Sequence, residues 1–327
     1  MTPWARAELA LRLLAVDPAG LGGLWLRARS GPVRDRLTAA LPALPLPQRR
    51  LHPQIDDTQL YGGIDVAATL GAGRAVAQAG VLDAPAALVL AMAERCPAGL
   101  AGRLAAALDA GGGHTLVALD EGAEPGEALP SGLADRLALH VDLEGVSLSE
   151  TREIPLASVR AGRLDVALPP APPEALRDLT VLAGRLGIAS LRAPALAMRA
   201  ARAHAALAGH GAVAADDLAV AAELVLGPRA TQLPADMPPD GRDEAEPPEP
   251  TEPTEPEPTE QEPTEPEPTE PAAESDATEQ ESASDHDGAP PEDLLVAAAQ
   301  AALPRDLLAG LAGGRAPRTS GGASGAG

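Results

Sequence analysis

A long acidic, proline-rich segment most constrains how this chain can fold. Residues 238–291 hold PTEPEPTE-like repeats and almost no bulky apolar side chain. Such a segment cannot offset the entropy cost of ordering by burial, so we expect a disordered linker over residues 236–290. The foldable parts are then residues 1–230 and a short helical segment at 291–311, followed by a flexible Gly-rich tail at 312–327. Because a chain rarely ends just after helices that follow a long linker, we also expect the natural sequence to continue beyond Gly327.

The charge of the chain is concentrated in the same segment. Residues 236–293 contain 22 acidic residues and one arginine, so they carry −21 of the net charge of −22. The remainder is nearly neutral, which argues against a nucleic-acid-binding surface. No run approaches the roughly 18 apolar residues of a membrane span, and the single cysteine, Cys96, fits a reducing compartment. We therefore expect a cytoplasmic protein with no nucleic-acid partner and no membrane span.

Apolar runs of strand length alternate with helical patterns in the first half of the chain. This alternation predicts an α/β core over residues 1–170, with a mostly parallel sheet covered by helices on both faces. From residue 171 the pattern is wholly helical and predicts a three-helix lid over residues 171–230. The expected strands are Leu24–Arg27, Ala86–Met92 and His114–Leu119, and the expected helices are 1–16, 31–41, 98–108, 173–186, 191–207 and 215–226, with an irregular stretch at 42–61 and a short helical piece opened by Gly62 and Gly63.

The segment Ser131–Leu143, SGLADRLALHVDL, combines a strand pattern with a cation. Apolar residues recur at every second position from Leu137 to Leu143, and this period predicts a strand with those residues on one face. Arg136 comes directly before the strand, where many ring-forming ATPases carry an arginine finger that reaches a nucleotide held by the neighbouring subunit. The alternative is an edge-strand arginine in a surface salt bridge.

Four segments, taken in order, resemble the AAA+ module of the magnesium chelatase family. They are YGGIDVAATLGAG, AALVLAMAE, SGLADRLALHVDLEGVS and SLRAPALAMRAARAHAALAGHGAVAADDLAVAAELVLGPR. The degenerate phosphate sites and the acidic linker are similar to those of the D subunits, in which an integrin-I-like domain follows; its DxSxS motif is not found in this sequence. The resemblance implies a AAA+ fold and a role in bacteriochlorophyll and chlorophyll biosynthesis, and therefore in photosynthesis. It also implies a complex that couples ATP hydrolysis to insertion of Mg²⁺ into protoporphyrin IX.

The phosphate-binding loop that this family requires is degenerate. A working loop has the form GxxxxGK[ST], because its backbone amides cradle phosphates and its lysine reaches the terminal ones. The matching stretch, RARSGPVRDRLT, retains Gly31, and the chain contains no lysine. Arg34 could contact a phosphate, but it differs from lysine in shape. We expect no nucleotide hydrolysis at this site.

The magnesium-binding motif is also incomplete. A hydrophobic strand should end in Asp-Glu, in which the aspartate holds Mg²⁺ and the glutamate polarises water. Here alanine precedes Glu94, so a single carboxylate remains, and a surface glutamate at a strand–helix junction is the alternative. The next strand offers Asp120 or Glu121 where a polar sensor residue is expected, and either would repel phosphates.

Two arginines match the family better than the phosphate sites do. The resemblance assigns Arg136 to the arginine finger, which acts in trans, and Arg192 to the sensor-2 position of the lid. For Arg192 the alternative is a solvated basic face that it shares with Arg199 and Arg202.

The resemblance favours a non-hydrolysing AAA+ subunit of magnesium chelatase, a metal–nitrogen ligase. It would assemble in a hetero-oligomeric ring with the ATPase I subunit and act with the H subunit that carries protoporphyrin IX. ATP and Mg²⁺ are then expected at the level of the complex, with none firmly bound by this chain, and the six scattered histidines suggest no metal site. The alternatives are an independent MoxR-like AAA+ ATPase or chaperone and a purely structural interaction module.

Overall fold

The structure, a computed structural model, describes residues 1–124, 126–155, 157, 167–232 and 292–304. The linker expected at residues 236–290 and the tail expected at 312–327 lie outside the described residues. Among the described residues, no helix combines the length and the apolar character needed to cross a membrane.

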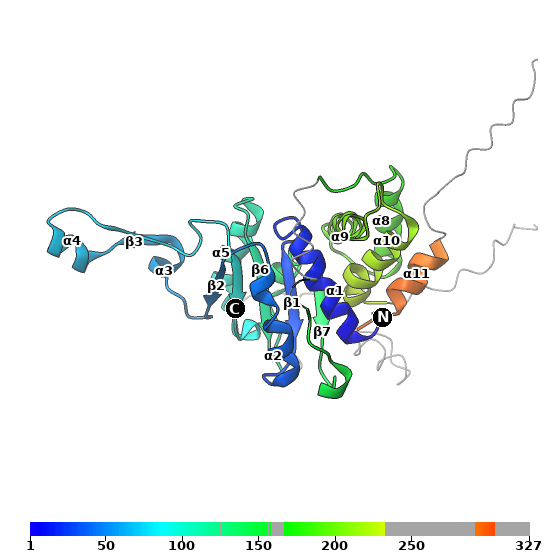
Figure 1. Cartoon of the computed structure of the whole chain (residues 1–327), viewed down its shortest axis with the longest axis horizontal. Helices are drawn as coiled ribbons and strands as arrows, with labels where there is room; N and C mark the ends of the chain where they lie inside the picture. The colour runs from blue at the N-terminus through cyan, green and yellow to red at the C-terminus, as the bar shows by residue number, and fades with distance from the viewer. Residues whose placement is uncertain (125, 156, 158–166, 233–291, 305–327) are drawn as a thin grey trace, which may run out of the picture. The chain divides into compact units, whose positions relative to one another are not determined.

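The centre of the core is a five-stranded parallel sheet (Figure 1), which confirms the predicted, mostly parallel sheet. Each neighbouring pair is parallel, and β1 lies between β6 and β7. Parallel strands need long crossover connections, and the intervening helices supply them. In spatial order the strands are β2 (Gln48–Leu51), β5 (Ala87–Leu90), β6 (Thr115–Asp120), β1 (Gly23–Arg27) and β7 (Leu139–Asp142).

Helices cover both faces of this sheet. This is seen in the strands, whose alternate residues belong to two different apolar clusters. On β5, Val89 belongs to one cluster, and Leu88 and Leu90 belong to the other. The first cluster includes Leu11 of α1 and the lid helices, and the second includes Leu104 of α5. The helices of the core are α1 (Pro3–Val16), α2 (Pro32–Thr38), α3 (Asp57–Tyr61), α4 (Val66–Ala72), α5 (Ala98–Asp109) and α6 (Ser131–Ala134), with short 3₁₀ turns at Leu41–Ala43, Ala93–Arg95 and Leu148–Glu150.

Two details of the predicted core were wrong. The stretch 42–61 is not irregular throughout, because it contains the edge strand β2 and the helix α3. In β2 only Leu51 is buried, so the strand has no apolar run to reveal it. The alternation over 137–143 also fails at Leu137, which joins the second cluster although Leu139 joins the first. The reason is that α6 and a turn precede β7, so Leu137 is not part of the strand.

The lid consists of the three expected helices. They are α8 (Ala175–Arg185), α9 (Ala193–Ala208) and α10 (Ala215–Ala221), and α10 continues into a π-helical turn over Ala222–Leu226. The alanine-rich α9 packs against α8, α10 and α1. Small side chains allow this close approach, and the lid therefore shares its apolar cluster with the sheet.

One helix from beyond the linker packs against the lid. This helix, α11 (Glu292–Gln300), falls within the segment expected to be helical and contacts α8 and the π-helical turn (Figure 1). Leu295 and Ala299 are fully buried there. Gly227 makes the contact possible, because a Cβ at this position would lie 2.6 Å from the Ala299 carbonyl oxygen.

A small hairpin extends away from the sheet (Figure 1). It consists of β3 (Gly62–Ile64) and β4 (Ala77–Ala79), which pair antiparallel, with α4 between them. The helical piece expected after Gly63 is α4, whereas the two flanking strands were not predicted. Val66 and Leu70 are 67% and 79% exposed, so they contribute nothing to the core.

Candidate functional site

The predicted site residues lie at opposite edges of the central sheet. Gly31 and Arg34 follow β1, and Glu94 follows β5, so these residues lie at the edge where the parallel strands end. Arg136 precedes β7 and therefore lies at the edge where the strands begin, and Arg192 from the lid joins it there. We call these the carboxyl edge and the amino edge. The structure thus does not bring all five predicted residues into one site.

At the carboxyl edge, the predicted phosphate ligand is already paired. Arg34 forms an ion pair with Glu121 and donates to the Ser30 hydroxyl at 2.8 Å. Glu94 accepts a hydrogen bond of 3.0 Å from the backbone N–H of Glu121, and only 4% of its side chain is exposed. The alternative of a solvent-exposed Glu94 is therefore wrong. Glu121, proposed as a repulsive sensor, instead connects these two residues.

The backbone at this edge is poorly suited to cradle phosphate. Gly31 has φ 154°, which favours glycine, and α2 begins directly after it at Pro32. Proline has no N–H, so one of the donors that a phosphate loop would offer is missing. Asp120 is fully buried and accepts hydrogen bonds from Trp25 Nε1 at 2.8 Å and from the Leu129 N–H at 3.2 Å. Asp120 therefore has a structural role, because it links β6 to β1 and to the loop at Leu129.

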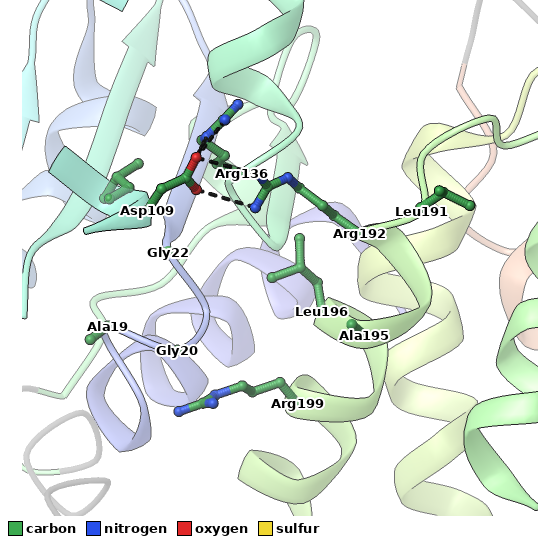
Figure 2. Close-up of a pocket in the computed structure, with 11 residues that line it drawn as sticks. Ala19, Gly20, Gly22, Asp109, Arg136, Leu191, Arg192, Ala195, Leu196 and Arg199 are labelled. Atoms are coloured by element: carbon green, nitrogen blue, oxygen red, sulfur yellow. Dashed lines mark hydrogen bonds and ion pairs between the residues drawn. The ribbon is translucent and has the colours of Figure 1, made fainter. Parts of the chain in front are cut away.

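The amino edge contains a pocket of about 330 Å³ whose wall includes three arginines (Figure 2). Arg136 comes from the turn before β7, whereas Arg192 and Arg199 come from the start and the middle of α9. Gly22 lets the chain before β1 form the opposite wall, because its φ is +68° and a Cβ there would lie 2.1 Å from the Arg136 carbonyl oxygen. The remaining lining residues are Ala19, Gly20, Leu108, Asp109, Leu191, Ala195 and Leu196.

Arg136 and Arg192 converge on one carboxylate in this pocket. Arg136 donates to Asp109 Oδ2 from Nη2 at 2.6 Å and from Nε at 2.9 Å. Arg192 donates to Oδ1 and Oδ2 of the same residue at 3.2 Å and 3.3 Å. The hydrogen bond and charge of Arg136, together with those of Arg192, lower the pKa of Asp109. Asp109 therefore serves as a common counter-ion for both predicted arginines.

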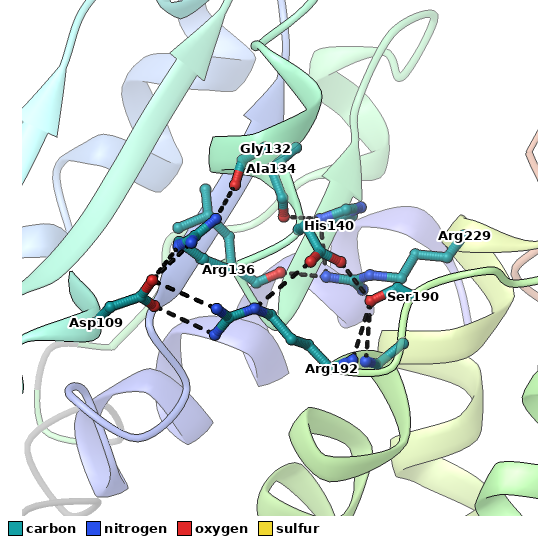
Figure 3. Close-up of polar contacts among 11 residues, drawn as sticks. Asp109, Gly132, Ala134, Arg136, His140, Ser190, Arg192 and Arg229 are labelled. Atoms are coloured by element: carbon teal, nitrogen blue, oxygen red, sulfur yellow. Dashed lines mark hydrogen bonds and ion pairs between the residues drawn. The ribbon is translucent and has the colours of Figure 1, made fainter. Parts of the chain in front are cut away.

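Local contacts fix Arg192 at the start of α9 (Figure 3). The Ser190 hydroxyl accepts the N–H groups of Arg192 and Ala193, each at 3.2 Å, and bonds to Asp135. Arg192 Nε also lies 3.7 Å from Asp135 Oδ2. This arrangement sets the direction in which the Arg192 side chain enters the pocket.

Arg192 and Arg199 are both about half exposed and line the same pocket, and each neighbouring arginine of α9 has a partner other than Asp109. Arg199 pairs with Asp17, and this hydrogen bond raises the pKa of Arg199. Arg202 donates to the carbonyl oxygens of Leu168 and Pro169 at 2.8 Å and 2.7 Å. Arg199 is thus bound to the end of α1, and Arg202 to the backbone that precedes α8.

Arg229, which the sequence analysis did not single out, ties the end of the lid to the amino edge (Figure 3). Its guanidinium donates to the carbonyl oxygens of Leu137, of Ala138 at 2.9 Å and of Val225 at 2.6 Å. It also lies 3.0 Å from Nε2 of His140, which packs edge-on against a tryptophan. Burial lowers the pKa of Arg229 to about 10, and burial followed by the charge of Arg229 keeps the pKa of His140 well below its usual value.

No group of three or more potential metal ligands occurs among the described residues. Burial raises the pKa of the Cys96 thiol to about 11, which fits a structural cysteine. The site that remains is therefore a cationic pocket whose guanidinium groups could bind the oxygens of a phosphate.

Comparisons with known proteins agree with this fold. The AAA lid domain family matches residues 177–250. The chain is 54% identical over 327 residues to the magnesium-chelatase 60 kDa subunit of Cereibacter sphaeroides, covering 99% of this chain and 54% of that protein. It is 44% identical over 243 residues to the magnesium-chelatase 60 kDa subunit of Rhodobacter capsulatus, covering 72% of this chain and 42% of that protein. The chain thus spans about half the length of these relatives.

A crystal structure of a candidate ATPase from Cytophaga hutchinsonii has a similar fold. The TM-score is 0.51 at 14% identity, with 68% of this chain and 84% of that chain covered. With the parallel sheet and the match to the AAA lid, this likeness confirms the predicted AAA+ fold class.

Proposed function

The chain belongs to the family of magnesium-chelatase 60 kDa subunits, and from this premise we propose that it acts as a non-hydrolysing AAA+ subunit of magnesium chelatase. The observation that carries the proposal is the convergence of Arg136 and Arg192 in one pocket at the amino edge. A subunit of this kind contributes cations to a nucleotide held by a neighbour and needs no nucleotide of its own.

The contacts at the carboxyl edge support the absence of hydrolysis. Arg34 forms an ion pair with Glu121, and the backbone N–H of Glu121 donates to Glu94. The chain contains no lysine that could contact the phosphates in place of Arg34. A nucleotide here would have to break these contacts without the amide that Pro32 lacks. We therefore propose that this chain holds neither ATP nor Mg²⁺ firmly, and that both belong to the complex.

In the proposed complex, the arginines act on the I subunit of magnesium chelatase. Phosphoryl transfer is accelerated chiefly by positioning and by cations that stabilise charge on the transferred group. Arg136 would donate to the phosphate oxygens of ATP bound by the neighbouring I subunit, and Arg192, held by Ser190 and Asp135, would provide the second cation. The H subunit would present protoporphyrin IX, and Mg²⁺ would be the substrate that is inserted. We place this hetero-oligomer in the bacterial cytoplasm, as part of bacteriochlorophyll biosynthesis.

The test is ATP turnover by the I subunit mixed with this chain, in wild-type form and as Arg136→Ala. We expect no turnover by the chain alone, and at least a tenfold loss of its effect on the mixture upon substitution, since a finger arginine contributes far more than this in other systems. Arg103→Ala, which breaks an exposed ion pair with Asp57, is the matched control and should leave the effect unchanged.

The other outcomes distinguish the alternative functions. If Arg136→Ala assembles normally and acts like the wild type, Arg136 is a surface salt bridge and the chain is a structural interaction module. Robust ATP turnover by the chain alone would instead favour an independent MoxR-like ATPase and contradict the interpretation of the carboxyl edge.

A further inference from the structure

Arg136 and Arg192 at the amino edge are paired with a carboxylate of the chain itself, in the absence of any neighbouring subunit. Among the described residues, the hydrogen bonds that the Asp109 carboxylate accepts come from Arg136 and Arg192 alone. A carboxylate presents its two oxygens to guanidinium groups in much the same way as a phosphate does. Asp109 thus occupies the position that a phosphate group would take between the two arginines.

The place of Asp109 in the fold makes this carboxylate a replaceable partner. It is the last residue of α5, where the helix dipole and the free carbonyl groups disfavour a negative charge. Its side chain is 36% exposed, and exposed ion pairs contribute little to stability. The two arginines therefore supply most of what stabilises the carboxylate at this position.

The other carboxylates around the pocket have additional duties. Asp17 accepts the Gly20 N–H at 3.1 Å as well as binding Arg199, and its side chain is only 12% exposed. Asp135 bonds to the Ser190 hydroxyl that also caps the start of α9. Displacing either would disturb the backbone, whereas displacing Asp109 would cost only its contacts with the arginines.

We propose that Asp109 is an internal counter-anion that holds Arg136 and Arg192 together until a phosphate group of a neighbouring subunit displaces it. This inference rests on the proposed function and concerns the regulation of the same site. Asp109 would keep both guanidinium groups in the pocket and would weaken their binding to any phosphate that does not come with the full contact of a neighbour. Asp109 competes with the incoming phosphate and takes no part in the chemistry.

The first experiment uses all 327 residues of this chain and needs no partner. Binding of inorganic pyrophosphate is measured by calorimetry at low ionic strength for the wild type, for Asp109→Asn and for Asp109→Asn combined with Arg136→Ala. We expect Asp109→Asn to bind pyrophosphate about fivefold more tightly, because an exposed carboxylate competitor is lost, and the combined variant to lose this gain. Asp57→Asn, which breaks the exposed pair with Arg103, is the matched control and should bind as the wild type does.

The second experiment uses the chain mixed with the I subunit and separates affinity from maximal rate. Asp109→Asn should lower the concentration of this chain needed for half of its effect on ATP turnover by about fivefold and leave the maximal effect unchanged. Circular dichroism and thermal unfolding confirm that each variant is folded.

The outcomes separate this inference from the proposed function. If Arg136→Ala removes the effect on turnover while Asp109→Asn binds pyrophosphate no better than the wild type, the proposed function stands and the counter-anion is refuted. A fall in the maximal effect of Asp109→Asn would also overturn the inference, because Asp109 would then be needed to orient the arginines. If Arg136→Ala assembles normally and does not change turnover, the proposed function itself fails.

Discussion

The two edges of the central sheet each hold an arginine against a carboxylate, but in different ways. At the carboxyl edge, Arg34 forms an ion pair with Glu121 and a hydrogen bond with Ser30. The backbone N–H of Glu121 in turn donates to the Glu94 carboxylate. At the amino edge, two arginines share Asp109 at the wall of a pocket. Interlinked contacts close a site, whereas a shared counter-ion leaves it open to exchange.

Under the proposed function, this comparison explains how a AAA+ fold can lose nucleotide hydrolysis and still supply cations to a neighbouring subunit. A nucleotide-binding site of this fold needs backbone amides around the phosphates, a lysine and two carboxylates, so the loss of any of them weakens nucleotide binding or hydrolysis. The amino edge needs only cations held in one direction. Such a site survives as long as the turn before β7 and the start of α9 keep their relation to each other.

The largest expected effect concerns the residue that maintains this relation. Replacing Arg229 by methionine should lower the free energy of unfolding by about 2–3 kcal/mol, because the carbonyl oxygens of Leu137, Ala138 and Val225 lose their donor in a part-buried place. Urea unfolding followed by circular dichroism measures the change. Because the lid would loosen from the amino edge, the effect of the chain on partner ATP turnover should fall as well.

The matched substitution at the carboxyl edge is Arg34→Met. It removes one ion pair and one hydrogen bond to Ser30, so we expect a loss of about 1 kcal/mol in the free energy of unfolding and no change in the effect on turnover. A loss as large as that of Arg229→Met would mean that the carboxyl edge, too, supports the lid, and the contrast between the edges would disappear.

A second substitution asks whether the carboxyl edge can be reopened by one change. Glu121→Gln frees Arg34 from its charged partner, but the chain still lacks the lysine and the amide at Pro32. We therefore expect pyrophosphate affinity to change by less than about twofold, compared with the fivefold gain for Asp109→Asn. A gain in pyrophosphate affinity equal to that of Asp109→Asn would identify Arg34 as a second phosphate ligand that Glu121 blocks in the wild type.

The sequence predicted those parts of the fold that burial determines. β5 and β6 are apolar runs buried almost throughout, so the runs themselves identify the strands. β2 was missed because a single buried residue, Leu51, gives no pattern. The lid helices were found because their apolar faces repeat at the helical period.

The candidate site was predicted only in part, for a related reason. Arg136 and Arg192 were found through the family resemblance, and the structure places both in one pocket. Asp109 was not, because an aspartate at the end of a helix has no local signature and its partners lie 27 and 83 residues away. Arg229 was missed likewise, since its contacts with the turn before β7 span about 90 residues. Side chains that join distant segments are what a single sequence reveals least.

The smallest expected change in the free energy of unfolding tests the charge of Asp109 directly. Arg136 and Arg192 lower its pKa in the folded chain, so its contribution to stability is present above the usual aspartate pKa of about 3.9 and is lost as the pH falls through the lowered value. We expect the wild type to exceed Asp109→Asn by less than about 1 kcal/mol in free energy of unfolding at pH 7, because solvent screens this exposed pair. Urea titrations between pH 3 and 7 should show the difference shrinking below about pH 4. Repeating them in an Arg136→Ala background should reduce the difference further, whereas a difference that is unchanged in that background would show that Asp109 does not depend on the arginine it is inferred to hold.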